Sequence, residues 1–412
     1  MDQLLFLTHR IPYPPNKGDK IRSFHILQYL CRHFHVHLAC FIDDPADRQH
    51  TALLETLCAS SCFIEHSPAT ARLRGLRGLL YGQPMSLHYY RNASLRRWVE
   101  QLLAGGAVRR ALAFSGPMAQ YLQPYAGAGL RRVIDFVDVD SEKWRQYAAA
   151  KDWPLSQLYR REAQRLLDYE RDVAGQFDAA TFVSAAEAAL FRLRAPQAGA
   201  RVSAFGNGVD TDYFSPRRDY ACPYPDGAAA LVFTGAMDYW PNVEAVQWFV
   251  WRVWPALRAR LPELRFYIVG ARPDAAVRAL ARAPGVSVTG TVPDIRPYLA
   301  HARLAVAPLR IARGVQNKVL EAMAMGKTVL ASPQALEGIA ASPGVELEVA
   351  DEAAAFIVQC ERLLAAPDNA GSGPFGQAAR RRILRDYNWD ACLAPLGALL
   401  GVAAQAPAEA LP

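Results

Sequence analysis

The residues best suited to chemistry stand together in one short stretch of the chain: Arg310, Arg313, Gly314, Lys318 and Glu321. Arginine and lysine side chains neutralise phosphate oxygens, and a glycine lets an anion approach the backbone closely. A carboxylate one helical turn after the lysine can accept hydrogen bonds from the hydroxyls of a ribose. The spacing therefore predicts a site for a nucleoside diphosphate. A solvated helix face with surface salt bridges is the alternative interpretation of the same residues.

A strand, a turn and a helix must position these side chains. The apolar run 304–307 predicts a strand, and a helix is expected from Val315 to Met325, ended by Gly326 in a left-handed cap. A second strand is expected at 328–331, which completes a unit typical of parallel sheets. Earlier in the same half of the chain, the apolar runs at 230–234 and 265–269 predict two further strands. The first amides of the helix lack intrahelical partners and the helix dipole is positive there, so this end attracts anions.

The segment PLRIARGVQNKVLEAMAMGKTVLAS resembles the donor-binding segment of the GT4 family of retaining glycosyltransferases. That family carries two glutamates eight positions apart, the second followed by an Ala-Met-Ala-x-Gly-like run. Glu321 matches the second glutamate, and Arg313 occupies the position of the first. The resemblance implies that Glu321 holds the ribose of a nucleotide sugar. It leaves the diphosphate to Arg310, Arg313, Lys318 and the backbone at Gly314.

A second motif, VSAFGNGVDTDYFSP at 202–216, resembles the stretch at which GT4 proteins cross between domains. The implied fold is α/β and of the GT-B type, with two Rossmann-like parallel-sheet domains facing across a cleft and a C-terminal helix crossing back to the first domain. We expect an acceptor-side domain at 1–216, a linker at 217–228 and a nucleotide-sugar-binding domain at 229–375. The returning helix is expected at 376–400, and a disordered tail at 401–412.

Three glycine-bearing turns complete the expected site. The loop THRIPYPPNKGDK follows the first strand and resembles the family's N-terminal glycine loop, which points to Gly18, Asp19 and Arg22. For Asp19 a helix N-cap is the alternative to a catalytic role. The turn at Gly235 matches the place where many GT4 enzymes carry a phosphate-binding Arg and Lys, and here Met237 and Asn242 stand instead. The turn at Gly290 resembles the family's nucleobase site.

Length and composition limit the function classes. A chain of 412 residues predicts two domains, and the net charge of +7 favours anionic partners. Seven scattered cysteines form neither a disulfide framework nor a zinc motif, and GT4 enzymes generally need no metal. We expect no cofactor beyond the nucleotide-sugar substrate and no nucleic-acid partner, because the typical recognition motifs are missing.

The expected location is the cytoplasm, because the first apolar run is too short for a signal peptide and no run is long enough to span a membrane. Residues 71–98 combine arginines with leucines and aromatic side chains. This pattern predicts peripheral contact with an anionic membrane surface, with an ordinary surface helix as the alternative.

The resemblance as a whole implies transfer of a sugar, with retained configuration, from a nucleotide diphosphate to a glycan or lipid-linked acceptor. Segments such as IPYPPNKGDKIRSFH and DFVDVDSEKWRQYA resemble transferases associated with bacterial exopolysaccharide export and PEP-CTERM sorting. Lys318, Arg313 and Asp19 are the expected catalytic residues. Two alternatives remain open: a sugar-nucleotide epimerase on the same fold, and a non-catalytic nucleotide-sugar-binding subunit.

Overall fold

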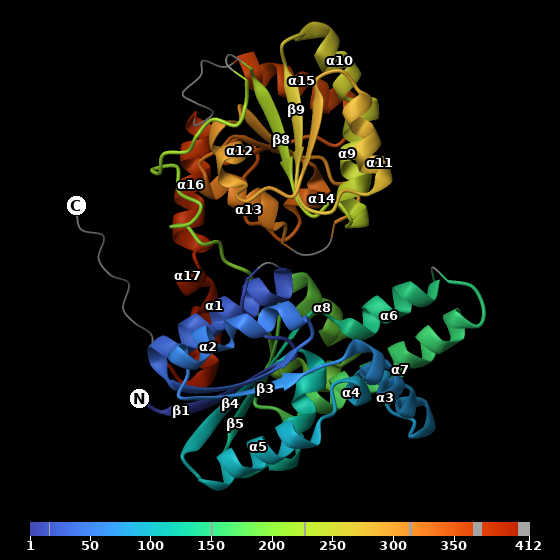
Figure 1. Cartoon of the computed structure of the whole chain (residues 1–412), viewed down its shortest axis with the longest axis vertical. Coiled ribbons are helices and arrows are strands. Elements are labelled where there is room, and N and C mark those ends of the chain that lie inside the picture. The colour runs from blue at the N-terminus through green and yellow to red at the C-terminus, as the bar shows by residue number, and fades with distance from the viewer. Residues whose placement is uncertain (16, 150, 226–227, 313–314, 366–372, 403–412) are drawn as a thin grey trace. The chain divides into compact units, whose positions relative to one another are not determined.

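A computed structural model describes residues 1–15, 17–149, 151–225, 228–312, 315–365 and 373–402. The chain divides into two compact units. Unit 1 comprises Met1–Gly206 and the chain from Leu393 onward, and unit 2 comprises Asn207–Cys392. Each unit is a parallel sheet with helices on both faces (Figure 1).

The sheet of unit 1 has seven strands in the order β3-β2-β1-β4-β5-β6-β7, and every pair is parallel. The interior strand β1 is buried from Leu4 to Thr8, as a continuous apolar run inside a parallel sheet requires. The strands are β1 Gln3–Thr8, β2 His35–Ile42, β3 Ser60–Glu65, β4 Val108–Phe114, β5 Arg131–Val137, β6 Ala179–Phe182 and β7 Val202–Ala204.

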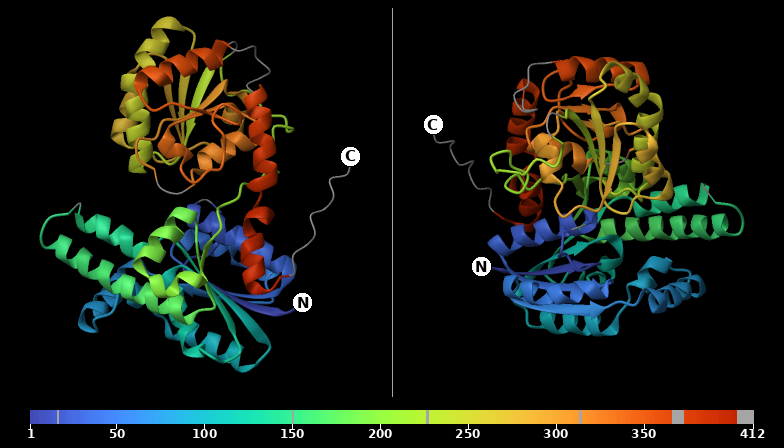
Figure 2. Two further views of the ribbon diagram at one scale, coloured as in Figure 1. Left: turned by 180° about the vertical axis from the view of Figure 1, so that it is seen from behind. Right: turned by 45° about the horizontal axis from the view of Figure 1, so that its top comes forward.

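Helices connect these strands, and α6 and α7 form a long hairpin that projects from the sheet (Figures 1 and 2). The rings of Trp144 and Tyr159 pack edge-on at 5.1 Å between the two arms. The helices of unit 1 are α1 Gly18–His33, α2 Thr51–Leu57, α3 Pro68–Leu80, α4 Met85–Tyr89, α5 Ala93–Ala104, α6 Asp140–Ala149, α7 Leu155–Gln176 and α8 Ala185–Arg194.

The sheet of unit 2 has six strands in the order β10-β9-β8-β11-β12-β13, again all parallel. Strands β8, β9 and β11 begin and end where the apolar runs predict. The strands are β8 Ala230–Thr234, β9 Arg265–Val269, β10 Val286–Gly290, β11 Leu304–Ala307, β12 Val329–Ala331 and β13 Glu348–Val349.

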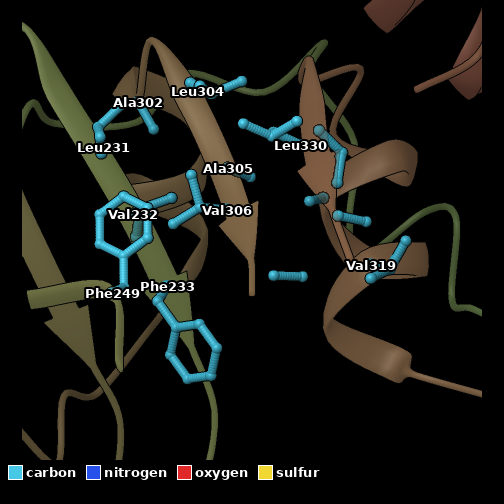
Figure 3. Packing of buried hydrophobic residues seen from close by; sticks show 14 of the residues in the cluster. Leu231, Val232, Phe233, Phe249, Ala302, Leu304, Ala305, Val306, Val319 and Leu330 are labelled. Carbon is cyan, nitrogen blue, oxygen red and sulfur yellow. The ribbon is translucent and has the colours of Figure 1, made fainter. Parts of the chain in front are cut away.

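The helices of unit 2 bury one apolar face each against this sheet. Figure 3 shows side chains of β8, β11 and β12 meeting Phe249 of α9 and Val319 of α13. The helices are α9 Trp240–Arg252, α10 Trp254–Arg260, α11 Ala275–Ala279, α12 Arg296–His301, α13 Asn317–Ala324, α14 Pro333–Leu336, α15 Ala353–Ala365 and α16 Pro374–Asp386. The last helix, α17 Trp389–Leu400, begins in unit 2 and ends in unit 1.

The division of the chain differs from the predicted one at 216. The segment after Gly206 belongs to unit 2, because the guanidinium of Arg380 donates hydrogen bonds to the backbone carbonyls of Thr211 and Phe214. The Val209 amide also donates to the Tyr387 carbonyl at 2.7 Å. These bonds attach the predicted end of the first domain to the second unit.

The single helix predicted at 376–400 is two helices, and only the second returns to unit 1. Helix α16 is fixed in unit 2 through Gly376, where a Cβ would lie 1.9 Å from the Gly326 carbonyl oxygen. Within unit 1, Leu400 accepts a 2.7 Å hydrogen bond from Arg110. The predicted tail lies outside the described residues from 403 onward.

Candidate functional site

Among the described donor residues predicted for unit 2, Gly235 and Arg310 lie next to the point where the direction of strand order reverses. Strand β8 lies between β9 and β11, and the chain continues from β8 toward one edge of the sheet and from β11 toward the other. Gly235 follows β8 directly, and the segment that contains Arg310 follows β11. Ligands of open α/β sheets bind at such a switch point, outside the carboxyl ends of the strands.

Helix α13 begins later than predicted, at Asn317 rather than Val315. Lys318 is therefore in its first turn and Glu321 one turn further along. The predicted residues Arg313 and Gly314 lie outside the described residues. The helix ends as predicted, with Gly326 in a left-handed conformation at φ +65°.

Lys318 is held in place by the neighbouring helix α9. Its Nζ donates a 2.8 Å hydrogen bond to Oδ1 of Asn242 and a longer one, 3.4 Å, to Gln316. Asn242 is itself fixed, because its Nδ2 donates to the Ala236 carbonyl at 2.9 Å. An ammonium anchored by two amide oxygens keeps its positive charge beside the free amides of α13, where a phosphate would bind.

Gly235 is needed because the backbone and these side chains approach it closely. A Cβ at Gly235 would lie 2.7 Å from Nδ2 of Asn242 and 3.4 Å from Cε of Lys318. A Cβ at Gly270, which follows β9, would lie 1.6 Å from the Gly235 carbonyl oxygen. The predicted turn therefore forms one wall around the lysine.

The carboxylate of Glu321 is available as a hydrogen-bond acceptor. Its side chain is partly exposed, and its carboxylate makes no hydrogen bond or ion pair to any described residue. Burial raises the pKa of Glu321 to about 7, against the opposing charge of Lys318. Burial likewise lowers the pKa of Lys318 to about 8, against the charge of Glu321. The free carboxylate can accept two hydroxyl groups.

These pKa values predict that diphosphate binding weakens at alkaline pH. The Lys318 side chain is mostly protonated below pH 8 and mostly neutral above it, because its pKa is about 8. A bound phosphate favours the protonated, positively charged form of this side chain. We expect the Kd for a nucleoside diphosphate to rise about fivefold between pH 8 and pH 9. Calorimetric titration at both pH values measures this change. The Lys318→Arg variant stays charged, so its Kd should not change over the same range; an equal rise in both proteins would contradict the assignment.

Gly290 lies at the carboxyl end of β10 with φ +70°, and a Cβ there would meet no atom within 4 Å. Beyond this turn, Arg296 forms an ion pair with Asp294 at 2.7 Å and lies 3.8 Å above the ring of Tyr213. Tyr213 is 41% exposed. The backbone of the turn therefore faces open space, which is compatible with the predicted nucleobase site.

Arg310 is turned to a different partner. Its Nη1 donates hydrogen bonds to the backbone carbonyl of Asp351 at 2.6 Å and to its carboxylate at 2.7 Å. The guanidinium also lies 4.9 Å from the ring centre of Trp248 on α9. Trp248 stands six positions after Asn242, or about 9 Å along the helix. Arg310 and Lys318 thus contact separate parts of α9.

The predicted residues of unit 1 lie at the start of α1. Gly18 is the first helical residue, and the N-cap is Lys17, so the N-cap alternative for Asp19 is wrong. The Asp19 carboxylate accepts instead from Arg10 at 2.9 Å and lies 3.3 Å from Nε2 of His9. Hydrogen bonds and charges from His9 and then Arg10 hold the pKa of Asp19 well below its usual range against burial.

Arg22, which the resemblance assigned to the same loop, is a structural residue. It is 1% exposed and forms a buried ion pair with Asp135 at 2.8 Å. It also donates to the Phe205 carbonyl and lies 4.0 Å from the centre of that ring. These partners stabilise the positive charge of Arg22 within the core of unit 1.

A polar cluster that was not predicted from the sequence lies at the carboxyl ends of β1, β2 and β3. Its members are His9, Arg10, Asp43 and His66. Arg10 joins Asp19 to Asp43, at 3.0 Å from the latter. His9 Nδ1, Asp43 Oδ1 and both ring nitrogens of His66 are buried without a partner among the described residues. Burial, and then the charge of Arg74, lowers the pKa of His66 to about 4. His9, Asp43 and His66 each directly follow a strand, and this position is the signal that could have identified them.

Two absences hold for the described ranges. No group of three or more His, Cys, Asp or Glu side chains there is placed to hold a metal ion. No helix within those ranges combines the length and the apolar character that crossing a membrane requires.

Comparison with known proteins identifies a domain and a fold. Residues 228–366 match the family of glycosyl transferases group 1. No curated protein matches the sequence. A glycosyltransferase from Rickettsia africae has a similar structure, with 12% identity, a TM-score of 0.63, and coverage of 97% of this chain and 99% of that chain.

Two further solved structures are similar over the same length. Sucrose-phosphate synthase from Thermosynechococcus elongatus has 17% identity and a TM-score of 0.65, covering 97% of this chain and 98% of its own. Anabaena HepE in complex with UDP has 15% identity and a TM-score of 0.64, covering 97% and 99%. The predicted fold of two Rossmann-like parallel-sheet domains is confirmed. The group 1 match in unit 2, together with this shared fold, supports a glycosyltransferase of the GT-B fold.

Proposed function

We propose that this protein is a retaining glycosyltransferase that moves a sugar from a nucleotide diphosphate to a hydroxyl of a glycan or lipid-linked acceptor. The observation that carries the proposal is the pair formed by Lys318, anchored on Asn242, and the unoccupied carboxylate of Glu321. A cation beside a helix start and a free acceptor one turn away match a diphosphate followed by a ribose. HepE, a structural neighbour, binds UDP and UDP-glucose, so UDP-sugars are the first donors to test.

In the proposed reaction the bond between the anomeric carbon and the diphosphate breaks as the acceptor oxygen attacks from the same face. The acceptor proton moves to a diphosphate oxygen, so no covalent enzyme intermediate forms. Lys318 and the first amides of α13 stabilise the negative charge of the leaving diphosphate. Arg313, which replaces the first family glutamate, and Arg310 are proposed as further phosphate ligands. Arg310 would first have to leave Asp351.

The acceptor is proposed to use the polar cluster of unit 1. Its unpartnered buried atoms on His9, Asp43 and His66 can each exchange a hydrogen bond with a hydroxyl group. The neutral imidazole of His66 offers one donor and one acceptor, which suits a sugar better than an anion. Gly18 and Asp19 belong to this proposal, with Asp19 positioning His9 and Arg10.

The cellular setting is part of the same proposal. We place the reaction on the cytoplasmic side of the membrane, in the synthesis of exopolysaccharide or another cell-surface polysaccharide. Residues 71–98 are proposed to contact the anionic membrane surface. The basic net charge of +7 supports an anionic partner.

Product analysis tests the proposal. The purified chain is incubated with UDP-, GDP- and ADP-sugars and a panel of glycan and lipid-linked acceptors, and the product is examined by proton NMR. A new glycosidic bond with the anomeric configuration of the donor is expected. An inverted product would overturn the retaining mechanism. Epimerised donor without a new bond would favour the epimerase, and donor binding without any turnover would favour a binding subunit.

A further inference from the structure

Helix α3 of unit 1 presents its leucines to the outside. Leu73, Leu76 and Leu80 are 69%, 50% and 84% exposed, and Tyr81, which follows the helix, is 70% exposed. The buried residues of the same helix are Ala71, Gly75 and Gly78. A surface helix normally buries its large apolar side chains and exposes small or polar ones, so this orientation is inverted.

Close packing fixes the inverted orientation. A Cβ at Gly78 would lie 3.0 Å from each of three backbone atoms of residues 83–85, and a Cβ at Gly75 would lie 3.4 Å from the Met85 carbonyl oxygen. Arg161 of α7 donates a 2.9 Å hydrogen bond to the Gly78 carbonyl. Only the glycine face can approach this closely, so α3 cannot rotate its leucines inward without losing these contacts.

Positive charge flanks the exposed apolar stripe. At 100° per residue, Leu73, Leu76 and Leu80 share the centre of the outward face, with Arg72 on one side and Arg77 on the other. Both arginines are exposed, and α3 contains no aspartate or glutamate. An apolar stripe between cations is the pattern of a helix that lies in a membrane interface.

A second apolar group lies at the tip of the α6–α7 hairpin. Trp153 is 79% exposed and Leu155 is 46% exposed. Arg161, the contact to α3, stands six residues after Leu155, or about 9 Å along α7. In both figures the hairpin and α3 project from the same side of unit 1 (Figures 1 and 2).

We propose that the outward face of α3 docks onto an anionic lipid bilayer, with the leucines in the acyl boundary and the arginines at the headgroups. The inference narrows the membrane contact proposed above to one helix face, and it does not depend on the donor site of unit 2. An anionic surface fits because the charged residues of the face are all positive. An apolar centre fits lipid rather than nucleic acid, whose contacts are mainly to charged phosphates.

Vesicle flotation of the full chain tests the proposal, with vesicles of phosphatidylcholine alone or mixed with phosphatidylglycerol. The wild type should float with the anionic vesicles and much less with the neutral ones. The double variant Leu76→Ser/Leu80→Ser should bind at least about tenfold more weakly, because it removes most of the apolar contact. Arg72→Gln/Arg77→Gln should reduce anionic binding roughly 30-fold, at about tenfold per 1.4 kcal/mol.

Matched controls come from other surfaces of unit 1. Leu193 on α8 is 79% exposed, and Arg131 at the start of β5 is exposed, so Leu193→Ser and Arg131→Gln should float like the wild type. Every variant should still bind nucleotide, which separates this test from failure of the donor site. Equal binding to neutral vesicles, no flotation, or equal loss in the controls would overturn the proposal. So would a wild-type dimer that Leu76→Ser/Leu80→Ser makes monomeric, which would assign the face to self-association.

Discussion

Replacing Lys318 by methionine is expected to lower kcat/KM for the nucleotide-sugar donor by about 10²- to 10³-fold. The substitution keeps an unbranched apolar side chain of similar length and removes the ammonium group, whose Nζ lies 5.3 Å from the ring centre of Phe233. The diphosphate carries its largest negative charge as it leaves the sugar. The decrease in kcat/KM should therefore come mainly from a lower kcat. Steady-state kinetics with the donor identified in the product assay measure the effect.

Arg310, the other described residue proposed as a phosphate ligand, is expected to contribute less than Lys318. Its guanidinium is engaged by Asp351 and Trp248, so Arg310→Met should reduce kcat/KM by less than about tenfold. Thermal unfolding of both variants must remain close to that of the wild type. If Lys318→Met retained turnover within a factor of about three, the lysine would not be the phosphate ligand.

The Asp135→Ala variant is expected to lower the free energy of unfolding by about 3–5 kcal/mol, because it leaves the Arg22 charge buried without its partner. Asp135 is fully buried and accepts hydrogen bonds from Nε of Arg22 at 2.8 Å and from Thr181 at 3.1 Å. Urea-induced unfolding of the full chain, followed by circular dichroism, measures the change.

An exposed ion pair serves as the comparison. Arg48 and Glu65 form a salt bridge with side chains 73% and 67% exposed, so Glu65→Ala should change stability by less than about 1 kcal/mol. Equal effects at the two sites would mean that burial does not govern these pairs. If Asp135→Ala were as stable as the wild type but no longer bound the donor, Arg22 would instead be assigned to the donor site, as the resemblance implied.

The sheet could be predicted from the sequence because its strands are continuous apolar runs. The runs at 230–234 and 265–269 are observed with the predicted bounds, since strands covered on both faces need apolar side chains at every position. The start of α13 was less predictable. Gln316 has extended backbone angles and no side-chain cap, so no capping residue marks the boundary in the sequence.

The sequence predicted the site residues whose spacing on one helix is itself a signal. It did not predict the hydrogen-bond partners that lie far away in the sequence. Lys318 and Glu321 stand out by their spacing on one helix. The partner of Lys318, Asn242, lies 76 positions away, and the partner of Arg310, Asp351, lies 41 positions away. The packing of α9 and α13 against the sheet brings the first pair together, whereas the second pair joins the segments that follow β11 and β13. Neither contact has a local sequence signal.

The most direct test of the donor site compares a nucleoside diphosphate with its 2′,3′-dideoxy analogue by calorimetry, in the wild type and in Glu321→Ala. UDP, GDP and ADP are titrated first, and the tightest ligand is used. Because the free Glu321 carboxylate is assigned to the ribose hydroxyls, the wild type should bind the natural ligand at least about tenfold more tightly than the analogue. In Glu321→Ala this difference should disappear. If no nucleotide binds, or if the preference survives the substitution, the donor site is not at α13.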